Sequence, residues 1–162
     1  MKISPDKEQE FVSTIERHKQ LIYKVCYLYA TDSFELNDLY QEVVINLWRG
    51  FSDFRGDSSI SSWIYRVGLN TCISYYRKSS SKPKTIPLVD NLEIYEDTIK
   101  TTQIKEMYRL IGKLSKIERA LILLWLDEKT YDEIGEIMGL NRNTVASRLK
   151  RIREKIVEMS NQ

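Results

Sequence analysis

The sequence has few of the residues that form tight turns, cross-links or metal sites. Its 162 residues include only 6 glycines, 3 prolines, 2 cysteines and 1 histidine. Because sandwiches and barrels need turn residues at most of their strand connections, this scarcity favours long helices. Cys26 and Cys72 lie in apolar segments without a CxxC spacing, which is typical of reduced core residues and not of a zinc site or disulfide. We therefore expect an all-α fold that needs no metal or other cofactor.

A strong charge of one sign and a long apolar segment are also lacking. The 25 lysines and arginines nearly balance the 23 aspartates and glutamates, so the net charge is +2. This excludes a uniformly basic coat protein and an acidic solvating tail. No stretch approaches the roughly 18 apolar residues of a membrane-spanning helix, and the N-terminal residues form no apolar signal segment. These features predict a cytoplasmic protein that does not insert into a membrane.

Three helices are expected in the N-terminal domain, residues 1–80. Ser4-Pro5-Asp6 is typical of a helix start, since proline suits the first helical position. An apolar stripe with a period near 3.6 residues predicts the second helix, from about Leu36 to Phe51. A loop over residues 51–59 leads to a third helix over residues 60–77. Its expected core positions are Ile60, Ile64, Val67 and Thr71.

Residues 81–103 lose this periodicity and contain proline and several acids, which predicts a flexible linker between two domains. The C-terminal domain, residues 104–162, begins with a helix from about Ile104. Two capping boxes, Ser115 to Glu118 and Thr130 to Glu133, each predict a further helix start. Asn141 is expected to cap a last helix. The buried stripe of that helix is Val145, Leu149, Ile152 and Ile156.

The last two helices predict a helix-turn-helix. A short turn containing Gly139 separates them, and the second helix of such a motif enters the major groove of DNA. Residues 142–155 carry six basic residues against one acid. Complementing the helix dipole explains Arg153 and Lys155, but not Arg142 at the N-terminal end. We therefore predict duplex DNA binding by the outward-facing residues, namely Arg142, Asn143, Thr144, Ser147, Arg148 and Arg151.

A second basic segment lies in the N-terminal domain, where residues 58–89 contain five basic residues and no acid. On the third helix, one stripe combines an aromatic ring, an amide and cations: Trp63, Arg66, Asn70 and Arg77. Such a stripe suits contacts to phosphates and stacking on unpaired bases. These residues leave an alternative open, in which Trp63 belongs to the core and the cations form an ordinary solvated face.

The second helix carries a patch of the opposite character, formed by Asp38, Gln41 and Glu42. Their spacing places them on one helical face. On a lone helix, solvated surface is the simpler interpretation, and docking of a basic or amide-rich partner is the alternative. No histidine lies near these carboxylates, and the sequence has no phosphate-binding glycine loop, Gly-x-Ser-x-Gly turn or His-Glu-x-x-His. We therefore do not expect an enzyme, and a small acid-dependent hydrolase has little support.

Three segments together resemble the extracytoplasmic-function (ECF) subfamily of bacterial RNA polymerase sigma factors. The first is NDLYQEV, residues 37–43, followed by Leu47 and Trp48. The second is SSISSWIYRV, residues 58–67, with Asn70 and the YYRK of residues 75–78. The third runs from YDEIG, residues 131–135, through TVASRLKR, residues 144–151. Their order and the length of the linker also match the family.

The resemblance implies a transcription initiation factor. In the family, the helix with the Asp-Leu-x-Gln-Glu motif docks on the clamp helices of the largest polymerase subunit, which implies this role for Asp38, Leu39, Gln41 and Glu42. The following loop and helix hold and open the minus-10 promoter element, which implies single-strand contacts from the loop over residues 54–59, including Arg55, and from Trp63, Arg66, Asn70, Arg77 and Lys78. The helix-turn-helix is similar to the module that reads the minus-35 element, and its apolar back meets the polymerase flap. Such proteins are usually held inactive by an anti-sigma factor.

Three positions depart from the family pattern. Ser61 stands where a basic residue is common before the tryptophan. Asn37 replaces a common acid, so the docking patch is expected to carry one charge fewer. Gly135 stands where alanine is common, and we expect it to cost up to about 1 kcal/mol of helix propensity.

The main alternative is a free-standing helix-turn-helix regulator that binds an operator as a dimer. The two interpretations differ on the acceptor-rich patch of the second helix, which only a sigma factor needs. A sigma factor also explains the near-neutral chain, because two weak DNA contacts carried by one polymerase act at high effective concentration.

Overall fold

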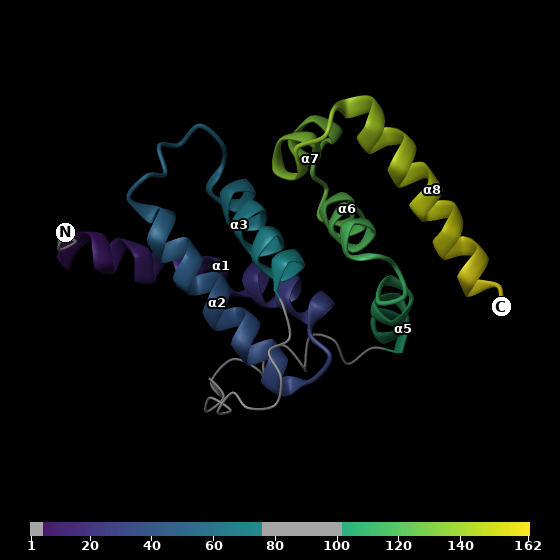
Figure 1. Cartoon of the computed structure of the whole chain (residues 1–162), viewed down its shortest axis with the longest axis horizontal. Coiled ribbons are helices and arrows are strands. Elements are labelled where there is room, and N and C mark those ends of the chain that lie inside the picture. Colours follow the sequence, from purple (N-terminus) through teal and green to yellow (C-terminus); the bar gives the residue numbers. More distant parts are fainter. Residues whose placement is uncertain (1–4, 76–101) are drawn as a thin grey trace. The chain divides into compact units, whose positions relative to one another are not determined.

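The computed structural model describes residues 5–75 and 102–162, and every regular element in those two ranges is an α-helix (Figure 1). The expected all-α fold is confirmed. The chain divides into two compact units, residues 1–87 and 88–162, which we call unit 1 and unit 2. Ser4 and residues 81–101 of the expected linker lie outside the described residues.

Unit 1 is a three-helix bundle of α1 (Pro5–Tyr29), α2 (Ser33–Phe51) and α3 (Ile60–Ser74), in which each helix packs against the other two. α1 begins at Pro5, as predicted. α2 follows Asp32, whose carboxylate accepts the backbone N–H of Glu35 at 2.8 Å and so caps the helix. All three helices contribute to one apolar core, which includes Ile22, Val25, Leu39, Val43, Leu47, Ile64 and Leu69.

α3 turns a different side to this core than the sequence predicts. Ile64 is buried, but Ile60, Val67 and Thr71 are only half-buried. Gly68 explains the difference. Glycine has no side chain, so a search for periodic apolar side chains does not mark its position as part of the core. Gly68 is buried, and a Cβ there would lie 3.6 Å from a methyl of Val25 and 3.7 Å from a methyl of Val43, so this glycine marks the side of α3 that faces α1 and α2. The buried side chains around it are Ser62, Ile64, Tyr65, Leu69 and Cys72.

α3 also ends earlier than predicted. Its last residue is Ser74, and Tyr75 has an extended backbone with φ −70° and ψ 123°. The prediction of a helix as far as residue 77 was therefore wrong. Arg77 and Lys78 lie outside the described residues.

The two cysteines are core residues with free thiols, as expected. Cys26 of α1 and Cys72 of α3 are both buried. Burial, reinforced by the neighbouring Cys72 thiol, raises the pKa of Cys26 well above its ordinary value. Cys26 is therefore a neutral thiol at physiological pH and behaves as a small apolar residue.

Unit 2 consists of α5 (Thr102–Ile111), α6 (Lys116–Leu126), α7 (Tyr131–Met138) and α8 (Arg142–Ser160). α5 begins two residues before the expected start at Ile104. Both predicted capping boxes are present at the starts of α6 and α7, and Asn141 caps α8. The core of the unit includes Ile111, Leu114, Leu121, Leu124, Ile134, Val145, Leu149 and Ile152. Ile156, the last residue of the predicted stripe, is only half-buried.

The turn between α7 and α8 depends on two glycines. Gly139 adopts the left-handed conformation, with φ 70°, and its N–H is bonded to the carbonyl of Gly135. The N–H of Leu140 donates to the same carbonyl at 2.9 Å. A Cβ on Gly135 would lie 2.5 Å from the carbonyl oxygen of Leu140. Gly135 is therefore a requirement of this turn, and the expectation that it only weakens α7 was incomplete.

Candidate functional site

The acceptor-rich patch lies on the outer side of α2. Asp38, Gln41 and Glu42 are half-buried there, opposite the core residues Val43 and Leu47. The patch is accessible to a partner because the apolar stripe of α2 turns the other side of the helix into the bundle.

Two neighbouring residues do not share this surface. Leu39 is 1% exposed and belongs to the bundle core, so it can influence docking only through the position of α2. Asn37 is 4% exposed, and its side-chain amide donates to the carbonyl of Ser33 at 3.0 Å. The expectation that Asn37 removes a charge from the patch was wrong, because this side chain faces inward.

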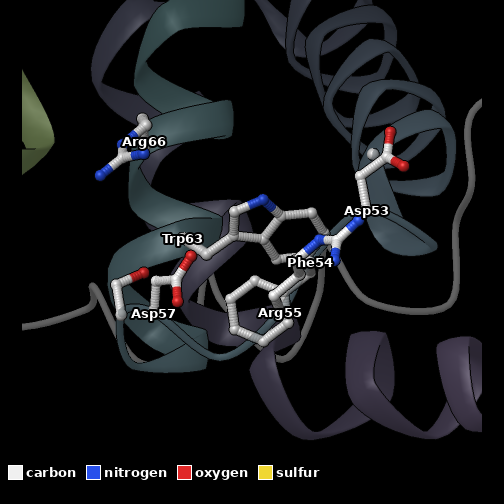
Figure 2. A pocket seen from close by; sticks show the side chains of 8 residues that line it. Asp53, Phe54, Arg55, Asp57, Trp63 and Arg66 are labelled. Atoms are coloured by element: carbon white, nitrogen blue, oxygen red, sulfur yellow. The ribbon is translucent and has the colours of Figure 1, made fainter.

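A cavity of about 300 Å³ lies between the α2–α3 loop and the start of α3 (Figure 2). It brings together three predicted minus-10 residues, Arg55, Trp63 and Arg66. Asn70 is exposed further along α3 and does not line the cavity. Gly56, with φ 79°, provides the left-handed turn of the loop. The complete lining is Gly50, Asp53, Phe54, Arg55, Asp57, Ser58, Trp63 and Arg66.

The indole of Trp63 is both a wall of this cavity and a packing element. The side chain is half-buried. Its ring centroid lies 5.0 Å from that of Phe54, with 33° between the ring planes, and 6.3 Å from that of the core residue Phe51. The ring of Trp63 therefore packs near the core and also borders the cavity, so core packing does not remove it from the accessible surface.

Two carboxylates line the same cavity, and in the view of Figure 2 they lie on opposite sides of the Trp63 ring. They belong to Asp53 and Asp57, and both residues are exposed. Sequence reasoning missed Asp53 and included Asp57 only as part of the loop over residues 54–59, because aspartate is also a common turn former. The available signal was the alternation of acid, base and acid at Asp53, Arg55 and Asp57. The cavity thus combines aromatic rings, two guanidinium groups and two carboxylates.

The second helix of the helix-turn-helix, α8, presents its polar side to solvent. Of the residues predicted to contact DNA, Arg142, Asn143, Ser147, Arg148 and Arg151 are exposed, and Thr144 is half-buried. Asn143, Ser147 and Arg151 lie on the side away from the buried stripe of Val145, Leu149 and Ile152, and Arg142 and Arg148 flank that stripe. This arrangement leaves one convex, polar ridge free to enter a groove.

The cations of α8 fall into two groups. Arg142 forms an exposed ion pair with Asp132 of α7 at 3.0 Å, Arg153 lies 5.0 Å over the ring of Trp125, and Lys155 contacts Glu118 at 3.2 Å. These three have partners within unit 2, so the position of Arg142 does not by itself require DNA. Arg148, Lys150 and Arg151 make no ion pair with any residue in the part of the chain that the structure describes.

The glutamates of the two capping boxes have pKa values below that of an ordinary glutamate. The backbone and hydroxyl of Thr130 hydrogen bond to Glu133 and lower its pKa. Burial raises the pKa of Glu118, but hydrogen bonds from Ser115 and Lys155 outweigh it, so the net pKa is lowered. Both carboxylates are therefore ionised at neutral pH and hold the starts of α6 and α7.

Residues 5–75 and 102–162 contain neither a metal-ligand cluster nor a membrane-spanning helix. No group of three or more His, Cys, Asp or Glu side chains there is placed to hold a metal ion. No helix in the same ranges has the length and apolar character needed to cross a membrane.

Comparison with protein families gives two matches, one in each unit. The model of sigma-70 region 2 matches residues 14–82, and the model of sigma-70 region 4 matches residues 104–156. The ECF RNA polymerase sigma-E factor of Escherichia coli is 30% identical over 140 residues, which cover 76% of this chain and 73% of the relative. The ECF RNA polymerase sigma factor SigM of Mycobacterium tuberculosis is 25% identical over 151 residues, or 92% of this chain and 76% of SigM.

Solved structures show the same fold. CnrH, determined in complex with the cytosolic domain of CnrY, aligns with a TM-score of 0.68 and 21% identity over 95% of this chain and 89% of its own. The sigma factor RpoE of Bartonella quintana, determined with the anti-sigma factor NepR, aligns with a TM-score of 0.65 and 15% identity over 98% of each chain.

Proposed function

This chain belongs to the extracytoplasmic-function RNA polymerase sigma factors, and we propose that its two units divide the work of starting transcription. Unit 1, within residues 1–80, docks on core RNA polymerase and holds the melted minus-10 element. Residues 104–162, which belong to unit 2, read the minus-35 duplex, and residues 81–103 link the two domains. The supporting observation is that the region 2 and region 4 models match the two units in order, while each unit exposes a different chemistry for DNA.

The docking role of unit 1 falls to the patch on α2. Asp38 and Glu42 supply negative charge and Gln41 an amide, so they complement a basic or amide-rich surface such as the polymerase clamp helices. Leu39 acts as a positioning residue, since its buried side chain fixes the face that α2 presents.

The minus-10 role of unit 1 falls to the cavity beside Trp63. A volume of about 300 Å³ suits one unstacked base, and aromatic rings bind such bases through their π-faces. Arg55 and Arg66 are placed to neutralise flanking phosphates, whereas Asp53 and Asp57 are placed to accept hydrogen bonds from an exocyclic amine. Asn70, Arg77 and Lys78 extend the same DNA path in this proposal.

The minus-35 role falls to the polar ridge of α8. Arg148 and Arg151 are exposed cations without an ion-pair partner among the described residues, and guanidinium groups bind guanine edges and phosphates. Asn143 and Ser147 suit base or phosphate contacts, and Arg142 reaches DNA if its pair with Asp132 opens. The apolar back of this unit meets the polymerase flap.

We also propose an anti-sigma factor as a regulatory partner, because RpoE of Bartonella quintana was solved with the anti-sigma factor NepR. The protein then works in the cytoplasm, has no catalysis of its own and needs no cofactor. A free-standing operator-binding dimer is not favoured, since family models match both units.

Run-off transcription with bacterial core polymerase tests the proposal. The purified chain should direct a promoter-dependent transcript, and the double variant Asp38→Lys/Glu42→Lys should lose polymerase binding and the transcript together. An unchanged transcript from the double variant would remove the docking role. Two-fold symmetric DNA binding without polymerase would instead support the operator-binding dimer.

A further inference from the structure

Two large apolar side chains stand on the otherwise polar outer side of α2. Phe34, in the first turn, is 47% exposed, and Ile45, in the second half of the helix, is 42% exposed. Single exposed apolar residues are common on protein surfaces. These two differ because both lie on the same helix as the docking patch of Asp38, Gln41 and Glu42.

The helical period places all five residues on one side of α2. Successive steps from Phe34 to Asp38, Gln41 and Ile45 are four, three and four residues, which keeps them in one row. Phe34 and Ile45 are eleven residues apart, so they stand about 16 Å from each other along the axis. The acceptor groups lie between them. The row is therefore apolar at each end and polar in the middle.

Because Leu39 is buried, the apolar contacts of α2 with a partner have to come from other residues of the helix. The docking motif contains Leu39 as its apolar residue, but that side chain is 1% exposed and is unable to enter a partner. A few well-buried residues contribute most of the binding free energy of a protein interface, so a docking face needs accessible side chains that a partner can bury. On α2 the exposed large apolar side chains are Phe34 and Ile45.

We propose that Phe34 and Ile45 are the apolar anchors of the docking face toward core RNA polymerase. The partner surface has hydrogen-bond donors or positive charge opposite Asp38, Gln41 and Glu42, with an apolar site at each end about 16 Å apart. Continuity with the acidic patch favours polymerase over any other occupant, because one surface then satisfies both the charges and the anchors. This inference rests on the proposed docking role of α2.

The test measures the affinity of full-length variants for core polymerase by competition with labelled wild-type protein. Phe34→Ala and Ile45→Ala each should weaken binding about tenfold, as truncated interface anchors do. Ile45→Leu keeps an apolar side chain and should stay within about threefold. Val12→Ala is the matched control, since Val12 is 58% exposed and belongs to another helix, α1; it should bind within about twofold of wild type. Thermal unfolding of each variant checks that the bundle is intact.

The outcomes separate this inference from the proposed function. Weaker binding by both α2 variants, with Val12→Ala unchanged, supports the anchors. Normal binding by both, while Asp38→Lys/Glu42→Lys loses polymerase, overturns the anchors and leaves the docking role standing. Normal binding by the charge-reversed variant as well overturns both. Loss of affinity in Val12→Ala equal to that in Ile45→Ala also overturns the anchors, since the effect is then not specific to α2.

Discussion

The two units offer nucleic acid surfaces of opposite shape and opposite charge arrangement. In unit 1 the candidate site is a hollow in which Arg55 and Arg66 share the lining with Asp53 and Asp57. In unit 2 it is a convex helix, on which Arg148 and Arg151 have no ion-pair partner within the described residues. Because the two carboxylates offset the two guanidinium groups, we expect the net attraction of this hollow to a phosphate backbone to be small, and ring stacking to contribute most of the binding free energy in unit 1. Unopposed cations on a ridge give an attraction that weakens with salt.

Among the variants that separate the two surfaces, Trp63→Ala is expected to have the largest effect on DNA binding. The change removes the aromatic wall of the unit 1 cavity, and base stacking on such a ring contributes about 1–3 kcal/mol per base. We expect permanganate reactivity of unpaired minus-10 thymines to fall about tenfold or more, while protection of the minus-35 duplex by unit 2 persists.

The matched variant Trp63→Phe keeps a ring in the same place and should retain most of the melting of the minus-10 DNA. Because Trp63 also packs near Phe51, circular dichroism must first establish that Trp63→Ala remains folded at the assay temperature. Equal loss of minus-10 and minus-35 protection in a folded Trp63→Ala protein would show that the two surfaces do not act separately.

Arg148→Ala should give the next largest effect, confined to unit 2. If the guanidinium group contacts a base edge, binding weakens by about 1–3 kcal/mol and selectivity at one minus-35 position relaxes. Arg153→Ala is the internal control: Arg153 lies over Trp125, so its loss should leave promoter selectivity unchanged.

Salt titration sharpens the same experiment. Arg151→Ala should weaken binding to all sequences alike and reduce the slope of log affinity against log salt by about 1 if Arg151 contacts a phosphate. Unchanged selectivity in Arg148→Ala, together with a reduced slope, would reassign Arg148 to the phosphate backbone.

Replacing one helical glycine in each unit with alanine tests how much room each unit has for an added methyl group. Alanine improves the helix propensity of a helical glycine site by about 1 kcal/mol. At Gly68 of α3 the added methyl meets Val25 and Val43 at ordinary contact distances of 3.6 and 3.7 Å, so Gly68→Ala should raise the free energy of unfolding. At Gly135 the methyl meets a backbone carbonyl at 2.5 Å, so Gly135→Ala should lower it despite the same propensity gain. Denaturant unfolding of both variants measures the two signs, and a stabilised Gly135→Ala would show that the turn shifts without cost.

The local features of this fold could be read from the sequence, because each depends on residues a few positions apart. The two capping boxes and Asn141 fix their helix starts through hydrogen bonds to residues three positions along. The buried side of α3 could not be read, since Gly68 has no side chain to mark the contact. The ion pair of Arg142 with Asp132 also escaped prediction, because it depends on the angle at which α8 leaves α7.

The candidate site shows the same limit. The sequence supplied Trp63 and Arg66 through their helical spacing, and it supplied the polar ridge of α8 through the buried stripe opposite. It gave no role to Asp53 and no individual role to Asp57, because the path of a loop decides whether its side chains line a hollow or point into solvent. Whether Leu39 is accessible depends likewise on how α2 is rotated in the bundle.

The smallest expected difference between the units is a response to acid. α3 begins at the hydroxyl cap of Ser59, which does not titrate, whereas α7 begins with a box closed by Glu133. Since the pKa of Glu133 is lowered by its bonds to Thr130, its contribution to stability is fully present above the unfolded pKa of about 4.3. That contribution is lost as the pH falls through the folded pKa. We expect acidification to speed hydrogen exchange at the start of α7 more than at the start of α3. Glu133→Gln still accepts a hydrogen bond without a charge that titrates, so it should flatten this pH dependence; if exchange in Glu133→Gln stays as acid-sensitive as in wild type, another carboxylate controls α7.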